Sequence, residues 1–136
     1  MRMRKEITIK SEIQNLRIIE KALDEFSAEI GISEVNYGKI MVSAMEAVNN
    51  AIVHGNKSVM EKIVRIEIAY IDNLLIISVE DEGPGFRPKE IPDPTMPENI
   101  ENISGRGVFL MSRLADKIEF NDAGNRVTMS FKDLKT

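Results

Sequence analysis

The chain has 136 residues, of which 43% are hydrophobic, and this size favours one globular domain covering residues 1–136. The formal net charge of −4 and the pI near 5.1 do not indicate a nucleic-acid-binding surface. No cysteine is present, which excludes disulfides, thiol catalysis and thiolate metal sites. Neither a signal peptide nor an apolar run of membrane-spanning length is evident, so we expect a cytoplasmic protein without a membrane partner.

Hydrophobic periodicity predicts a mixture of strands and helices, because a period of two marks strands and a period near 3.6 marks helices. Gly31 and Gly55 end the first two helices, and Asp72-Asn73 is typical of a tight hairpin turn. In chain order the expected elements are a strand over 6–10, helices over 12–30 and 33–54, strands over 62–71 and 74–81, a helix over 106–115, and strands over 117–121 and 126–133.

The residues before the third helix differ in character from the rest of the chain. All five prolines fall at positions 84, 88, 92, 94 and 97, and proline excludes a central strand or a long helix there. A loop of this length inside a compact domain usually has a function or is disordered. We interpret residues 86–104 as a lid over a ligand site; a connector with no task is the alternative.

Asp81 stands where a core side chain is expected. Leu75, Ile77 and Val79 share one face of their strand, and Asp81 continues that apolar phase. Burying a carboxylate there costs on the order of several kcal/mol unless hydrogen-bond donors meet it. Gly83 and Gly85 follow, and they let backbone approach a flat ligand such as adenine closely. A turn whose acid reaches solvent is the alternative.

The second predicted helix carries a narrow polar stripe of Ser43, Glu46, Asn50 and His54 beside its apolar face. Glu46 and Asn50 are one turn apart, about 6 Å along the axis, so both can address one ligand. A carboxylate can activate a hydroxyl or water, and an amide oxygen can ligate Mg²⁺. A solvated helix face is the alternative.

Gly105-Arg106-Gly107 is expected directly before the third helix. Free N–H groups at a helix N-terminus, and an arginine beside them, suit phosphate groups. A flexible hinge is the alternative. The preceding loop is acidic, so a polyphosphate there needs a divalent cation, and Asn50 is its natural protein ligand.

Taken in order, three motifs resemble the GHKL ATP-binding fold: the ten residues of 46–55, Asp-Glu-Gly-Pro-Gly-Phe at 81–86, and Gly-Arg-Gly-Val-Phe-Leu-Met at 105–111. The resemblance covers nearly the whole chain, and the chain looks most like the small bacterial anti-sigma-factor serine kinases. It implies a two-layer α/β sandwich, with helices on one face of a mixed, mostly antiparallel sheet.

The resemblance also implies roles for single residues. Glu46 would be the general base and Asn50 the Mg²⁺ ligand, while Asp81 would bind the adenine amino group. Gly83 and Gly85 would shape the pocket, and Gly105, Arg106 and Gly107 would lie along the phosphates of ATP. Roles for His54 and Lys57 stay open. The family often has threonine after the glycine of its final hairpin, whereas Gly124 is followed here by Asn125, which could still form a hydrogen bond.

The leading hypothesis from this resemblance is an ATP-dependent protein serine/threonine kinase that acts as a partner-switching regulator. It would bind a sigma factor, phosphorylate an anti-anti-sigma protein of the STAS type and form a homodimer. A nucleotide-gated binding module without significant kinase activity is the second hypothesis. A gyrase-type or chaperone-type ATPase needs further domains, and a histidine kinase needs a phosphoacceptor helix, so both are disfavoured.

Overall fold

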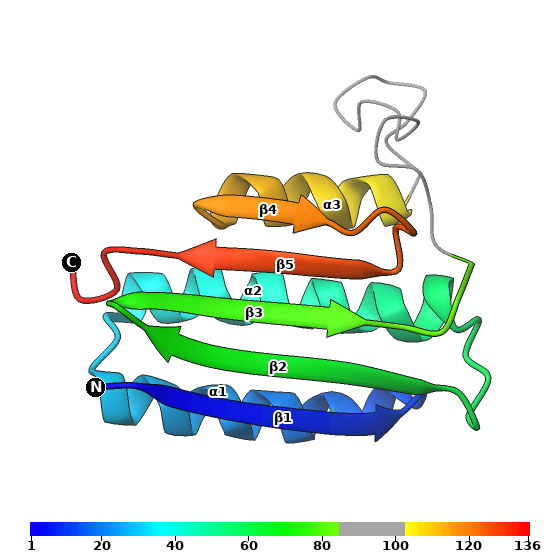
Figure 1. The fold of residues 1–136 in the computed structure, drawn as a ribbon, viewed down its shortest axis with the longest axis horizontal. Helices are drawn as coiled ribbons and strands as arrows, with labels where there is room; N and C mark the ends of the chain where they lie inside the picture. Colours follow the sequence, from blue (N-terminus) through cyan, green and yellow to red (C-terminus); the bar gives the residue numbers. More distant parts are fainter. Residues whose placement is uncertain (85–102) are drawn as a thin grey trace.

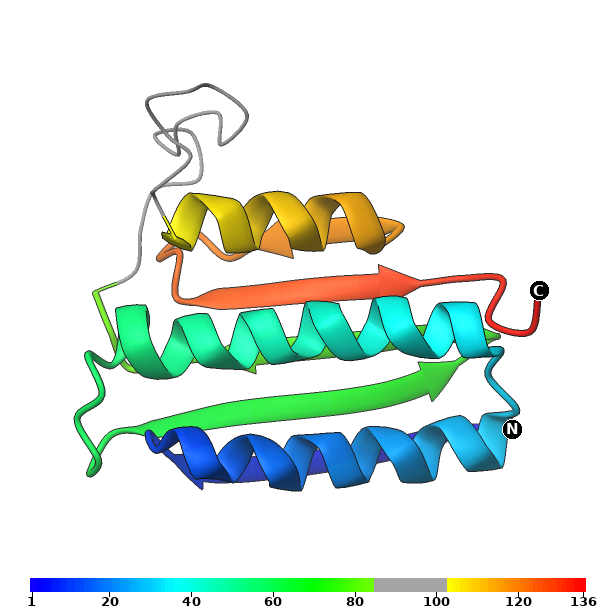
Figure 2. The ribbon, with the colours of Figure 1, turned by 180° about the vertical axis from the view of Figure 1, so that it is seen from behind.

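The computed structural model describes residues 1–84 and 103–136, with side chains from Gly107 onward in the second range. In this part of the chain a five-stranded sheet has the order β1-β2-β3-β5-β4, and each neighbouring pair is antiparallel. In the same residues, three α-helices cover one face of that sheet (Figures 1 and 2). The elements are β1 (Met3–Lys10), a 3₁₀ turn (Ile13–Asn15), α1 (Leu16–Ile30), α2 (Glu34–Asn50), a π-helical turn (Ala51–Gly55), β2 (Ile63–Ile71), β3 (Leu74–Glu80), α3 (Ile103–Leu114), β4 (Lys117–Phe120) and β5 (Arg126–Phe131). The predicted two-layer sandwich is confirmed, and within the described residues its sheet is antiparallel throughout instead of mixed.

The core lies between the sheet and the helices. Alternate residues of the central strands face it, as Ile68 of β2 does opposite Ile77 of β3, and both are fully buried. The α1 side chains Ile19, Leu23 and Phe26 recur at helical spacing and are buried against the same core. Burying such side chains is the main contribution to folding, at roughly 25 cal/mol per Å² of apolar surface.

The Asp72-Asn73 turn fixes the register of the central hairpin. Both residues have positive φ, 54° and 64°, which is the conformation that a two-residue type I′ turn requires. With this turn Ile71 pairs with Leu74, and the register continues to Arg65 opposite Glu80. Because the register fixes which side chains face the core, the turn also sets the direction of the residue that follows β3.

Three chain segments reach the same end of the molecule: the C-terminal end of α2, the C-terminal end of β3 and the N-terminal end of α3 (Figure 1). The predicted elements are found, but two of the element boundaries at this end of the molecule differ from the prediction. The second helix changes from α to π geometry at Ala51, and α3 begins at Ile103 instead of at residue 106. The predicted lid lies outside the described residues apart from its last two positions, where α3 has begun.

Candidate functional site

The backbone of Asp81 is held by the closing hairpin. Its N–H donates to the Asn125 carbonyl at 2.9 Å, which extends the pairing of β3 with β5 by one residue. The Asn125 side chain donates back to the Asp81 carbonyl at 3.1 Å. Asn125 therefore fixes the main chain from which the predicted adenine-binding carboxylate projects.

The Asp81 carboxylate is half-buried, as the phase of β3 predicts. Burial raises the pKa of this carboxyl, and the neighbouring Glu80 adds to the rise. The N–H of Gly83 donates to Asp81 Oδ1 at 2.8 Å, and this hydrogen bond, together with the charge of Lys62, acts in the opposite direction. Burial is the largest influence on this pKa, so a further hydrogen-bond donor would stabilise the ionised carboxylate.

Two glycines pack tightly against this carboxylate. A Cβ on Gly55 would lie 2.3 Å from Asp81 Oδ2, and one on Gly83 would lie 2.1 Å from the Gly55 carbonyl oxygen. Any side chain at either position would displace Asp81 or the backbone. Gly83 was a predicted site residue. The sequence predicts Gly55 only as a helix end, although its place five residues after Asn50, at the end of the same helix, could have indicated the contact.

The functional groups of α2 meet the first turns of α3. Glu46 and Asn50 are both partly exposed, and Gly107 is buried beside them. A Cβ on Gly107 would lie 2.6 Å from Asn50 Nδ2 and 3.1 Å from Glu46 Oε2. The structure therefore brings these three predicted residues together, with glycine backbone facing a carboxylate and an amide.

Asn50 Oδ1 is buried and has no hydrogen-bond partner in the described part of the chain. An unpartnered buried amide oxygen lowers stability by about 1–3 kcal/mol. A hydrogen-bond donor or a metal ion that binds this oxygen would remove that cost. The described residues contain no cluster of three or more metal-ligating side chains. A Mg²⁺ ion at Asn50 would accordingly take most of its ligands from phosphates and water, as Mg²⁺ commonly does.

Several other residues of the predicted site have positions that differ from the prediction or lie outside the described residues. Ser43, predicted on the same polar stripe as Glu46 and Asn50, is fully buried, and its hydroxyl donates to the Lys39 carbonyl at 2.8 Å. Gly105 and Arg106 belong to the first turns of α3 instead of preceding the helix. The Arg106 side chain and Gly85 lie outside the described residues.

His54 and Lys57 follow the Glu46–Asn50 pair but take different positions. His54 belongs to the π-helical turn and is partly exposed, whereas Lys57 is exposed with a φ of 55°.

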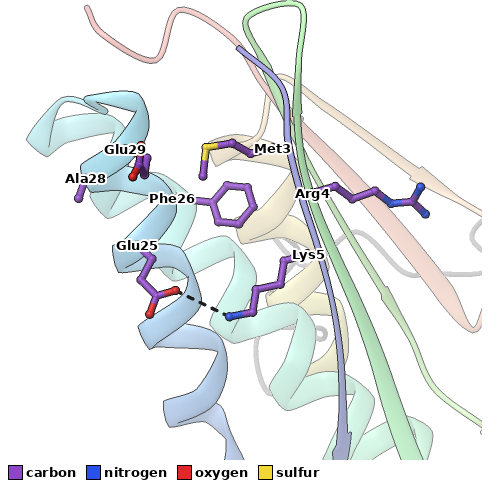
Figure 3. A pocket seen from close by; sticks show the side chains of 7 residues that line it. All are labelled: Met3, Arg4, Lys5, Glu25, Phe26, Ala28 and Glu29. Atoms are coloured by element: carbon purple, nitrogen blue, oxygen red, sulfur yellow. Dashed lines mark ion pairs between the residues drawn. The ribbon is translucent and has the colours of Figure 1, made fainter.

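A hollow of about 770 Å³ lies elsewhere, between β1 and α1 (Figure 3). Phe26 and Met3 form its apolar wall, and Lys5 pairs with Glu25 across it at 3.7 Å. Because Met3 pairs with Tyr70 beside the Asp72-Asn73 turn, the hollow is at the opposite end of the sheet from Asp81. It therefore takes no part in the candidate site. Within the described residues, no helix is long and apolar enough to cross a membrane.

Comparison with known proteins identifies the class to which this fold and site belong. Residues 9–131 match the model of the histidine kinase-like ATPase domain. An anti-sigma F factor of Clostridium perfringens is 30% identical over 136 residues, covering 96% of both chains. An anti-sigma F factor of Clostridium botulinum is 32% identical over 130 residues, covering 90% of this chain and 89% of the other.

The fold has a solved counterpart in a crystal structure of the RsbU and RsbW domains of a Mycobacterium tuberculosis protein. The TM-score is 0.65 at 22% identity, and the match covers 96% of this chain but 32% of the longer one. The chain therefore belongs to the histidine kinase-like ATPase domain family, of GHKL type, and groups there with proteins named anti-sigma F factors. Its membership defines it as an ATP-binding domain.

Proposed function

We propose that this protein is an ATP-dependent serine/threonine protein kinase that acts as a partner-switching regulator. The observation that carries the proposal is the meeting of Glu46, Asn50 and the Gly107 backbone at one end of α2. A base, an amide oxygen and close backbone are the parts that phosphoryl transfer requires, because this reaction depends on positioning and electrostatic stabilisation.

Glu46 acts as the general base in this proposal. Its carboxylate takes the proton of a substrate serine or threonine hydroxyl as that oxygen forms a bond to the γ-phosphorus of ATP. The bond between that phosphorus and the bridging oxygen breaks, and ADP leaves. Gly107 allows the first turns of α3 to approach Glu46 closely, and Gly105, Arg106 and Gly107 would lie along the phosphates.

Asp81 recognises the other end of the nucleotide. Its carboxylate accepts a hydrogen bond from the exocyclic amino group of adenine, which supplies the donor that burial makes favourable. Gly55 and Gly83 hold the backbone close to this carboxylate, and Gly83 and Gly85 would leave room for the flat base.

Asn50 would hold Mg²⁺ through its unpartnered amide oxygen. A Mg²⁺ ion bound there would neutralise part of the charge of the ATP phosphates. This role suits an amide better than a carboxylate, because the neighbouring Glu46 already carries a negative charge when it acts as a base.

The names of the relatives support the proposed partners. Proteins called anti-sigma F factors suggest that this chain binds a sigma factor. The phosphorylated protein would be an anti-anti-sigma protein of the STAS type, and a phosphate adds about −2 charge to its docking surface, which would release it. We propose that the protein acts as a homodimer in the cytoplasm.

Transfer of labelled phosphate from ATP to a STAS protein encoded in the same genome tests this proposal. Glu46→Ala should keep ATP affinity and lower transfer by about 10²–10⁴-fold, the usual contribution of a general base. Glu34→Ala is the matched control, since Glu34 is exposed at the opposite end of the same helix. Undiminished transfer by Glu46→Ala would refute the assigned base.

The same assay separates the second hypothesis. If the wild-type protein transfers no phosphate but binds its protein partner differently with ATP, ADP and no nucleotide, it is a nucleotide-gated binding module. Equal partner affinity in the three states excludes that module.

A further inference from the structure

Asn56 is a fully buried polar residue that the proposed chemistry does not use. It follows the π-helical turn, and its own N–H donates to the Ala51 carbonyl at 2.8 Å. A buried amide is tolerated only when its donors and acceptor are satisfied. The partners of Asn56 therefore show which parts of the chain its presence fixes.

The Asn56 side chain joins three segments that are distant in sequence. Its Nδ2 donates to Ser11 Oγ at 2.8 Å, after β1, and to the Ile63 carbonyl at 2.9 Å, at the start of β2. Its Oδ1 accepts from the Glu82 N–H at 2.7 Å, directly after Asp81. One side chain thus connects the end of α2 with the turn that carries Asp81.

The Asp81 turn is consequently held on both sides. Asn125 bonds the main chain of Asp81, and Asn56 bonds the main chain of the next residue. Glu82 adds a second link, since its Oε2 accepts from the Ile63 N–H at 2.6 Å. The Gly55 carbonyl packs against Gly83 in the same place. Of these contacts, the hydrogen bond from the Glu82 N–H to Asn56 is the one that ties the turn, through a buried side chain, to the end of the helix that carries Glu46 and Asn50.

We propose that Asn56 is a positioning residue that fixes the Asp81 carboxylate and thereby sets the preference of the site for adenine over guanine. Adenine presents an amino donor where guanine presents a carbonyl oxygen, which a carboxylate repels. Sites built around a required donor discriminate strongly against analogues that lack it, provided that the acceptor is held in place. The proposal rests on the adenine-binding role of Asp81 in the proposed function.

Two measurements on Asn56→Ala test this role. In the nucleotide-free protein, amide hydrogen exchange at Glu82 and Gly83 should become about tenfold faster, as expected when a buried hydrogen bond is lost. In calorimetric titrations, the ratio of the Kd for GTP to the Kd for ATP should fall by about tenfold, mainly through weaker ATP binding. Asn56→Ser is measured in parallel, and it carries the same test if Asn56→Ala does not fold.

Ser11→Ala is the matched control. It removes the Ser11 Oγ that Asn56 bonds and the 2.6 Å bond from that hydroxyl to the Lys62 carbonyl, but it leaves the bond to Glu82. It should lower the melting temperature while leaving both the exchange rates at residues 82–83 and the nucleotide preference unchanged.

The proposal is overturned if a folded Asn56 variant keeps wild-type exchange and preference, or if Ser11→Ala lowers the preference as much as the Asn56 variants do. A wild-type protein that binds ATP and GTP equally would instead refute the adenine-binding role of Asp81. In that case the exchange rates still decide whether Asn56 fixes the turn.

Discussion

Gly107→Ala separates the stability of the protein from the function of its site. Gly107 lies inside α3, where alanine is intrinsically better than glycine by about 0.5–1 kcal/mol. The new methyl group would, however, lie 2.6 Å from Asn50 Nδ2 and 3.1 Å from Glu46 Oε2. The substitution therefore favours the helix and disturbs the two side chains proposed for catalysis.

The distances set the expected size of the disturbance. An ordinary carbon contact begins at about 3.4 Å, so Asn50 must retreat by about 0.8 Å (3.4 − 2.6) and Glu46 by about 0.3 Å (3.4 − 3.1). A misplacement of about 1 Å in a catalytic group can cost about 10²-fold in rate. We expect transfer to fall by roughly 10–100-fold, while the free energy of unfolding changes by less than about 1 kcal/mol.

Gly38→Ala in α2 is the control, because a Cβ there meets no atom within 4 Å. It should raise the free energy of unfolding by about 0.5–1 kcal/mol without altering phosphate transfer. Urea denaturation and the labelled-phosphate assay measure the two properties separately. Full transfer and unchanged ATP affinity in Gly107→Ala would refute the meeting of α2 and α3 as the place of catalysis.

Two further substitutions should stabilise the nucleotide-free protein while weakening ATP binding. Burial raises the pKa of Asp81 in the folded state, so that state binds more protons than the unfolded chain, and stability falls as pH rises through the window between the two pKa values. Asp81→Asn removes this loss: its melting temperature should exceed that of wild type at pH 7 and converge with it in acid, while calorimetry detects weaker ATP binding. Asn50→Leu removes an unpartnered buried oxygen, so it should also raise the melting temperature. Its ATP affinity should no longer respond to chelation of Mg²⁺, and a Mg²⁺ response equal to that of wild type would exclude Asn50 as a ligand.

Periodicity predicts the elements of this fold because each element has one buried face. The apolar phase of β3 predicts that Asp81 points inward, and the spacing of Glu46 and Asn50 predicts their common face; both expectations match the described geometry. These features depend on local geometry alone, and local geometry is what the order of apolar and polar residues records.

Contacts between distant segments are not recorded in this way. Asn56 follows a helix end, where asparagine ordinarily serves as an exposed cap, so its burial depends on Ser11 and Glu82 arriving from elsewhere. The π geometry of Ala51–Gly55 differs from an α-helix by one residue of hydrogen-bond register, which the apolar pattern does not distinguish. The two glycines at 105 and 107 favour a break before a helix, yet the helix contains them.

The candidate site is built at the expense of stability. A half-buried carboxylate, an unpartnered amide oxygen and glycines in place of better helix formers all lower the free energy of unfolding of the nucleotide-free protein. A nucleotide that supplies an amino donor to Asp81 and a Mg²⁺ ion to Asn50 would relieve the first two costs at opposite ends of one ligand. Relief of these penalties would lower the Kd for the nucleotide, and binding would stabilise the fold by mass action according to that Kd. Under the proposed function, this coupling would allow the nucleotide to favour one conformation of the turn after β3 and of the start of α3, which are the two segments next to the predicted lid.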